Sequence, residues 1–298
     1  MLNVFLNDLD RGIEFGLVTP GGAVLGARLA GMLYPLAKYG YLELARYEFA
    51  ISASYWNLLF AHTPLEVMLP GIGIYPYHCT SRQFRPRGLK INFDYLEEVV
   101  GRIIEPGLPM LRKSLSKIYA GVTNAKTGEG EIICAQSVEN IFRLGSASSN
   151  MVGKPIKVNK GSYVDGGYFF SQTELLRASI ERLPRVKHIV MLAPSFTGLE
   201  CRIGWRENLA LRALGLLGSK SLLATTGSRA ARCTENMRFL WPHLSQVREP
   251  FIHILKPAGP KIRRTDRRVN LVHEAVRASA NATFRLLGLP EEDLVLPR

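Results

Sequence analysis

The sequence predicts an α/β fold: a central, mostly parallel sheet in a three-layer sandwich with helices on both faces. Two observations lead to this prediction. Short apolar runs alternate with amphipathic stretches at helical spacing over the first two thirds of the chain, and several of the apolar runs end in glycine-containing turns. With 298 residues, 47% of them hydrophobic, the chain is long enough to enclose a sizeable core.

The first elements are two strands, each followed by a tight turn and a helix. A strand is predicted at residues 15–19, with a glycine-rich turn and a helix over residues 26–40 after it. A second strand at residues 49–51 leads into a helix that Pro64 stops. Residues 65–87 are irregular and rich in Pro, Gly and Tyr, which indicates a long loop or lid.

The alternation then continues to about residue 193. Helices are predicted at 94–105, 108–115, 138–144 and 172–182, and strands at 117–122, 132–136, 163–164 and 188–193. Beyond this point only helical patterns are found, at residues 207–244 and 269–287, with the basic connector KPAGPKIRRTDRR between them. We therefore expect an α/β core over residues 1–200 and a helical C-terminal extension over residues 201–298 that packs on it.

The charge of the chain limits the classes of partner. A formal net charge of +13 favours anionic partners such as lipid headgroups, nucleic acid or acidic proteins. The basic connector is either a solvated linker or a segment in peripheral contact with an anionic membrane, which would gain about 1 kcal/mol per basic residue. Nucleic-acid binding is not expected, because no recognisable reading module accompanies the charges. Nothing in the sequence predicts the oligomeric state.

The remaining composition predicts a cytoplasmic protein without a metal. The first residues lack the pattern of a signal peptide, and no apolar run reaches the roughly 18 residues of a membrane span. The four cysteines show no metal-ligand spacing, so free thiols in a reducing compartment are expected. The six histidines are scattered without the spacing of a zinc site.

Three turns at predicted strand ends carry candidate chemistry, because ligands collect at the carboxyl ends of strands in such sheets. The first turn could offer backbone N–H groups to an oxyanion, or could serve packing alone. At the second, Ser54 is either an exposed nucleophile or a helix N-cap. At the third, Asp165 is either a functional residue or one that bonds its own turn. The first turn contains Gly21, Gly22 and Ala23.

Taken together, the three turns resemble those of the patatin-like phospholipase family, over roughly residues 13–196. The segments LAGMLYPLAKYG, IYAGVTNAKTGEGEIIC and SASSNMVGKPIKVNKGSYVDGGYF are also similar to family segments. The resemblance implies a patatin-like sandwich in which Ser54 is the nucleophile, Asp165 is the base, and the turn at residues 21–23 is the oxyanion hole. It further implies hydrolysis of lipid or other acyl esters through an acyl-serine intermediate, without a metal or organic cofactor.

The match to the family is divergent at two of these turns. With Ser54 as the centre of G-x-S-x-G, Ser52 and Trp56 replace the glycines, so either the helix is displaced or Trp56 lies across the acyl pocket. Trp56 and Gly166 are the expected pocket residues. Ala23 and Leu25 replace a glycine and an arginine that the family prefers. The alternative functions are a catalytically weak or inactive relative that binds lipid or a protein, and a basic interaction protein with a purely structural sheet.

Overall fold

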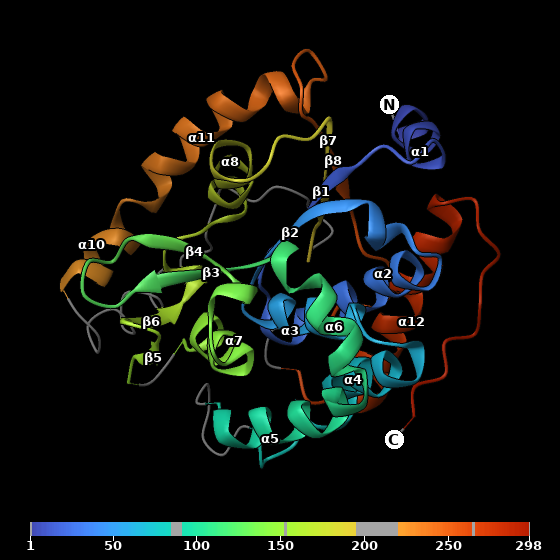
Figure 1. Ribbon diagram of the computed structural model, residues 1–298, viewed down its shortest axis with the longest axis horizontal. Coiled ribbons are helices and arrows are strands. Elements are labelled where there is room, and N and C mark those ends of the chain that lie inside the picture. The colour runs from blue at the N-terminus through green and yellow to red at the C-terminus, as the bar shows by residue number, and fades with distance from the viewer. Residues whose placement is uncertain (1, 85–90, 152–153, 195–219, 264–265, 298) are drawn as a thin grey trace.

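A computed structural model describes residues 2–84, 91–151, 154–194, 220–263 and 266–297. The described residues form one eight-stranded sheet between two layers of helices (Figure 1). The predicted α/β class is therefore confirmed.

The sheet has the strand order β5-β6-β3-β2-β1-β7-β8, and β4 also pairs with β3. The pairings of β3 with β2, β2 with β1, β1 with β7 and β7 with β8 are parallel, whereas β3–β4, β3–β6 and β5–β6 are antiparallel. The carboxyl ends of β1, β2 and β3 consequently meet at one edge of the sheet. The strands are β1 (Phe15–Thr19), β2 (Ala45–Ile51), β3 (Ile118–Asn124), β4 (Gly130–Cys134), β5 (Ile156–Val158), β6 (Gly161–Asp165), β7 (His188–Leu192) and β8 (Phe251–Leu255).

Helices cover both faces of the sheet. The α-helices are α1 (Leu2–Asp10), α2 (Gly26–Lys38), α3 (Ala53–Ala61), α4 (Leu65–Tyr77), α5 (Phe93–Ile104), α6 (Leu108–Ser114), α7 (Ile141–Ser149), α8 (Gln172–Arg182), α10 (Lys220–Gly227), α11 (Arg229–Leu244) and α12 (Val269–Leu286). The 3₁₀ helices are η1 (Ala23–Leu25), η2 (Tyr41–Leu44), η3 (Glu105–Gly107), η4 (Leu115–Lys117), η5 (Ala135–Ser137) and η6 (Gly166–Tyr168). One face carries α2, α3, α4, α5, α7 and α12, and the opposite face carries α8 and α11 (Figure 1).

The face with α2 and α12 holds the larger apolar core. These two helices approach backbone to backbone, because Gly31 has no Cβ, and a Cβ there would lie 2.3 Å from the carbonyl oxygen of Val276. On the opposite face a smaller core joins α8 and α11 to the sheet through side chains such as Leu175 and Leu240.

Two of the differences between the prediction and the structure concern helix α4 and strand β8. Residues 65–77 form helix α4 and not a loop, because the segment is buried on most of its surface and packs in the core despite Pro70 and Pro76. Strand β8 was not predicted at all: it forms an edge of the sheet within a region where only helices were expected. Strands β7 and β8 pair across the expected boundary at residue 200. Residues 207–219 of the predicted helical segment lie outside the described residues.

Three further findings bear on the expectations from composition. None of the described helices is long and apolar enough to cross a membrane. Within the described residues, no group of three or more His, Cys, Asp or Glu side chains is placed to hold a metal ion. Cys79 and Cys134 are free thiols, but Cys233 is disulfide-bonded, so the expectation of free thiols is wrong for that residue.

Candidate active site

Ser52 occupies the turn between β2 and α3 in a strained backbone conformation. Its φ of 56° and ψ of −130° lie in a backbone region that residues other than glycine rarely adopt. Such strain costs on the order of 1–3 kcal/mol and persists only where the surroundings enforce it. Here the N–H of Ser52 donates to Ser148 Oγ at 2.8 Å, and that hydroxyl donates to the carbonyl of Gly121 at 2.8 Å. Helix α7 and strand β3 therefore hold the turn.

Ser54, the nucleophile expected from the family resemblance, lies in a different environment. It is the second residue of α3 and has no exposed surface. Its hydroxyl donates to the carbonyl of Pro20 at 2.7 Å and so ties the turn after β1 to α3. The hydroxyl of Ser54 is thus engaged in a buried hydrogen bond. The strained strand-to-helix turn lies two residues earlier, at Ser52.

The glycine-rich turn after β1 packs directly against Ser52. A Cβ on Gly21 would lie 2.9 Å from the Cβ of Ser52, so only glycine permits this approach. Gly22 precedes η1, and Ala23 begins it with a φ of 50°, in the left-handed region that favours glycine. The first N–H groups of a helix have no acceptor within that helix. The expected oxyanion turn and Ser52 are therefore neighbours.

Asp165 lies at the carboxyl end of β6 and is buried. Its Oδ1 accepts the N–H of Gly167 at 2.6 Å. The register places it near Ser52: Val122 pairs with Asp165, and Ile51, the residue before Ser52, pairs with Gly121. Ser52 and Asp165 are thus about two strand spacings, or roughly 10 Å, apart between backbones, one on each side of β3.

Gly166 lets the β6 end approach the neighbouring strands. A Cβ there would lie 2.2 Å from the carbonyl oxygen of Gly121 and 3.0 Å from the side chain of Ile51. This residue, expected to line the pocket, therefore provides a close contact between backbones beneath the site.

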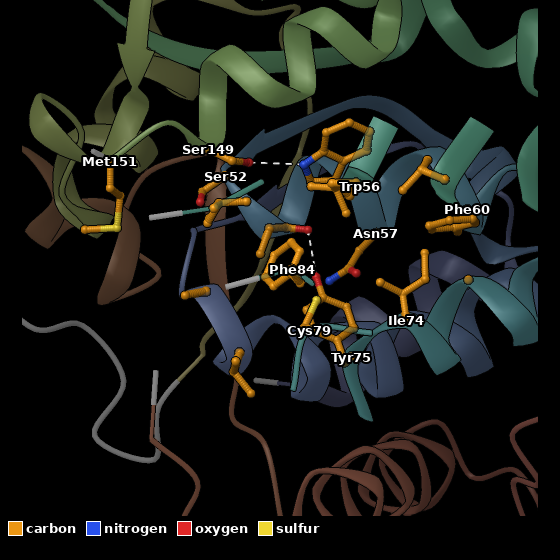
Figure 2. A pocket seen from close by; sticks show the side chains of 17 residues that line it. Ser52, Trp56, Asn57, Phe60, Ile74, Tyr75, Cys79, Phe84, Ser149 and Met151 are labelled. Atoms are coloured by element: carbon orange, nitrogen blue, oxygen red, sulfur yellow. Dashed lines mark hydrogen bonds between the residues drawn. The ribbon is translucent and has the colours of Figure 1, made fainter. Parts of the chain in front are cut away.

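An apolar pocket opens beside Ser52 (Figure 2). Its empty volume is about 590 Å³ when its opening to solvent is included. In Figure 2, Ser52 and Met151 lie on one side of the pocket, and Phe60 and Ile74 on the opposite side. Helices α3, α4 and α5 supply much of the wall. The lining residues are Ala23, Val24, Ser52, Ala53, Trp56, Asn57, Phe60, Gly71, Ile74, Tyr75, Cys79, Phe84, Ile91, Leu96, Val100, Ser149 and Met151.

Trp56 forms part of this wall without crowding the turn. Its Nε1 donates to Ser149 Oγ at 3.1 Å, and its ring stacks on Phe142 with 6.5 Å between centroids. Gly145 provides the space, because a Cβ there would lie 2.7 Å from the indole. Of the two expected arrangements for Trp56, the structure thus places its indole at the pocket.

Two buried tyrosines near the site remain neutral hydrogen-bond donors. Burial raises the pKa of Tyr75 well above its usual value, and its hydroxyl donates to the carbonyl of Ala53 at 2.9 Å. Burial, and secondly the charge of Asp165, raise the pKa of Tyr168, whose hydroxyl donates to the carbonyl of Met151 at 2.6 Å. Neither tyrosine is suited to accept a proton at neutral pH.

The sequence also contains a signal for Ser52, beside the one for Ser54. In the window Ala50-Ile51-Ser52-Ala53-Ser54, small residues occupy both positions where the nucleophile-elbow pattern has glycine. With Ser52 as the central serine, Trp56 also lies outside the pattern. The contribution of Ser148 had no comparable signal, since it depends on the position of α7 beside β2.

Comparisons with known proteins include a distant likeness in structure. No protein-family model matches the sequence, and no curated protein matches it. The crystal structure of VipD from Legionella pneumophila is similar, with 14% sequence identity and a TM-score of 0.43. The alignment covers 92% of this chain and 67% of that one.

Proposed function

We propose that this protein is a serine acyl-ester hydrolase in which Ser52 is the nucleophile and Asp165 the base. The observation that carries the proposal is the strained backbone of Ser52 at a strand-to-helix turn, beside an apolar pocket. Strained residues of this kind concentrate at functional sites, and a nucleophile elbow uses such a turn to expose its serine. The patatin-like character of the three turns in the sequence agrees with this function.

The choice of Ser52 over Ser54 follows from their contacts. Ser52 lines the pocket, and no hydrogen bond between described residues engages its hydroxyl. The hydroxyl of Ser54 is fully buried and bonded to Pro20. A nucleophile must reach a substrate carbonyl, and Ser54 would have to break this contact and leave the core to do so.

In the proposed reaction, Ser52 Oγ attacks the carbonyl carbon of the ester while Asp165 accepts the hydroxyl proton. The negative oxygen of the tetrahedral intermediate is stabilised by N–H groups of the turn Gly21-Gly22-Ala23. Collapse of this intermediate breaks the ester C–O bond, and the leaving alcohol takes the proton from Asp165. Water, activated by Asp165, then attacks the acyl-serine, which releases the acid and restores Ser52.

The pocket favours a substrate with an apolar acyl chain. The described residues that line it include no Asp, Glu, Lys or Arg, and aromatic and aliphatic side chains such as Phe60, Phe84 and Leu96 dominate. An alkyl chain that leaves water for such a pocket gains about 0.8 kcal/mol per buried CH₂ group. We therefore infer that lipid esters or other long acyl esters are the substrate class.

Covalent labelling with a fluorophosphonate tests the proposal. We expect one adduct, located by peptide mass spectrometry on Ser52. Ser52→Ala should abolish it, and Asp165→Asn should slow its formation by about 10²-fold or more, because general-base assistance is lost. Ser54→Ala is the matched control: it removes the bond to Pro20 and about 1 kcal/mol of stability, but should keep the adduct on Ser52.

Other outcomes have definite meanings. An adduct on Ser54 that survives Ser52→Ala would restore Ser54 as the nucleophile. If the folded wild-type protein forms no adduct and hydrolyses no p-nitrophenyl ester of short or long chain, the hydrolase function is refuted. Binding of a fluorescent fatty acid in the same pocket would then support the alternative of an inactive lipid-binding protein.

A further inference from the structure

Helices α10 and α11 are held by hydrogen bonds beside the turn Asp165-Gly166-Gly167, called the Asp165 turn below. From α10, Ser221 Oγ donates to the carbonyl of Lys126 at 2.9 Å, and Thr225 Oγ1 donates to the carbonyl of Gly128 at 2.9 Å. Both acceptors lie in the turn between β3 and β4. The start of α11 is thereby held beside η6, which follows Asp165 directly.

Two arginines of α11 bind the backbone just after Asp165. Arg229 Nη1 donates to the carbonyl of Gly167 at 3.0 Å. Arg232 Nη2 donates to the carbonyl of Phe169 at 3.3 Å, and its guanidinium lies over the Phe169 ring, 5.0 Å from the centroid. Gly167 is therefore held from both directions, because its N–H also donates to Asp165 Oδ1 at 2.6 Å.

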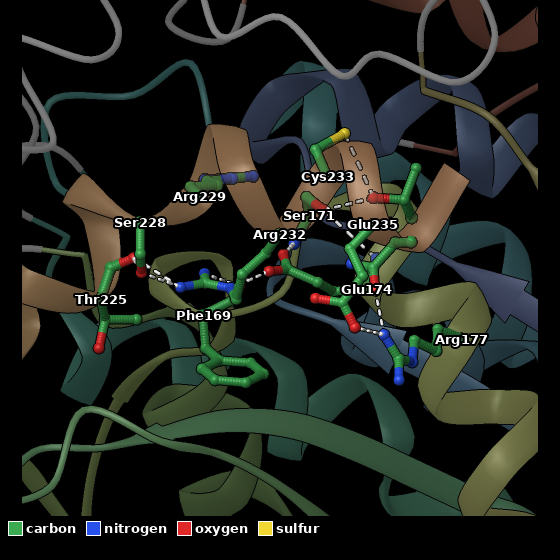
Figure 3. Close-up of polar contacts among 12 residues, drawn as sticks. Phe169, Ser171, Glu174, Arg177, Thr225, Ser228, Arg229, Arg232, Cys233 and Glu235 are labelled. Atoms are coloured by element: carbon green, nitrogen blue, oxygen red, sulfur yellow. Dashed lines mark hydrogen bonds and ion pairs between the residues drawn. The ribbon is translucent and has the colours of Figure 1, made fainter. Parts of the chain in front are cut away.

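The roles of the two arginines differ. Arg232 also forms an ion pair with the buried carboxylate of Glu174, and Figure 3 shows it between Ser228 and Glu174. Glu174 caps α8 together with Ser171, so the loss of Arg232 would disturb the start of that helix as well. Arg229 contacts the Asp165 turn itself, which makes it the more informative residue.

We propose that Arg229 is a positioning residue that keeps the Asp165 turn in register with Ser52. This inference rests on the proposed hydrolase function. The carboxylate of Asp165 must meet a serine on the far side of β3, and a displacement of about 1 Å in such a pair costs on the order of 10²-fold in rate. A guanidinium that fixes the carbonyl of Gly167 also fixes the peptide whose N–H orients Asp165 Oδ1.

The test compares Arg229→Met with Arg177→Met in the full-length protein. Arg177 joins α8 to α11 through Glu235 and Asn236 but does not contact the Asp165 turn, so it is a matched loss of an arginine in the same interface. The measurements are kcat and KM for p-nitrophenyl octanoate, and amide hydrogen exchange of the peptide that contains residues 163–170. Arg229→Lys serves as the conservative variant.

For Arg229→Met we expect kcat to fall about tenfold to 10²-fold with KM unchanged within about twofold, because positioning and not binding is lost. Exchange at residues 163–170 should quicken. Arg229→Lys should recover part of kcat, and Arg177→Met should leave kcat and this exchange unchanged.

Normal kcat and normal exchange in Arg229→Met would overturn the inference, as would equal effects in Arg177→Met. Hydrogen exchange separates this failure from failure of the proposed function. If the wild-type protein is inactive, the hydrolase proposal fails. Faster exchange in Arg229→Met would still support the positioning of the turn, and unchanged exchange would refute it.

Discussion

The two faces of the sheet are covered by different kinds of contact. On the face with α2, α3, α4 and α12, helices pack through a large apolar core, and α2 and α12 touch through their backbones at Gly31. On the opposite face the apolar core is smaller, and arginines connect the helices: Arg177 pairs with Glu235 at 2.8 Å, and Arg232 pairs with Glu174. Figure 2 shows the apolar pocket on the first face, and Figure 3 shows the polar contacts on the second.

The two parts of the candidate site are therefore held by different kinds of contact. Ser52 and its pocket belong to the apolar side, where close packing makes small changes in volume costly. The turn that carries Asp165 is bound from the opposite face, where Arg229 and Arg232 donate to the carbonyls of Gly167 and Phe169.

The largest effect on stability should come from Gly31→Ala on the apolar side. The added Cβ would lie 2.3 Å from a backbone oxygen of α12, so the helices must separate, at a cost of about 2 kcal/mol. Gly101→Ala in α5 is the matched control, because its nearest atom is 4.0 Å away, and it should gain about 0.5–1 kcal/mol from helix propensity. Urea unfolding of both variants measures the difference, and equal effects would contradict the packing argument.

An effect of comparable size is expected from acid, through His253. Burial, and then the neighbouring His188, lower the pKa of His253 from 6.5 to about 4. Between these values the unfolded chain binds a proton that the folded protein does not, so the free energy of unfolding falls as the pH drops through this window. The loss should be on the order of 1–3 kcal/mol.

His253→Gln should reduce this pH dependence between pH 7 and 4.5, which urea unfolding at several pH values would show. The remainder should come from His78 and His273, whose pKa values are also lowered by burial. Asp8, whose pKa is lowered mainly by its hydrogen bond to Lys187, loses its contribution only below its ordinary value of 3.8, outside this window. An unchanged slope in His253→Gln would rule out His253 as the cause.

The smallest effect should come from Arg177→Met on the charged side. Arg177 binds Glu181 and Glu235, each at 2.8 Å, but all three side chains are partly exposed. The variant should lose about 0.5–1 kcal/mol in low salt. In 1 M NaCl the wild-type and variant proteins should unfold at nearly the same urea concentration, because salt screens the pairs. A loss that persists in high salt would assign the effect to packing on Phe239 instead.

Much of the fold could be predicted from periodicity, because alternating strands and helices leave local patterns. The errors arose where tertiary contacts override those patterns. Helix α4 contains Pro70 and Pro76, which favour a loop locally, but burial on most of its surface stabilises the helix. Strand β8 is a five-residue segment in a helical region, and its pairing partner β7 lies about sixty residues earlier in the chain.

The positions of the three turns could be predicted from the sequence, whereas their role as a functional site stays a prediction. The structure places each turn at the end of a strand, and the pairing registers of β1, β2, β3 and β6 bring the three turns close together. What the sequence could not decide is which of two serines, Ser52 or Ser54, has the strained backbone. Both are small polar residues at a helix start, and only the φ and ψ angles and the contacts of Ser148 and Pro20 distinguish them.

The hydrogen bonds around α3 have a consequence for ligand entry. Tyr75 from α4 binds the carbonyl of Ala53, Asn57 binds the carbonyl of Gly26, and Ser54 binds that of Pro20. These cross-links join the pocket wall, the turn after β1 and the Ser52 turn into one unit. The pocket is thus preformed. The conformational entropy lost on binding is therefore mainly that of the flexible chain of the ligand. Rigid or pre-bent acyl groups should bind more tightly than flexible ones of equal size.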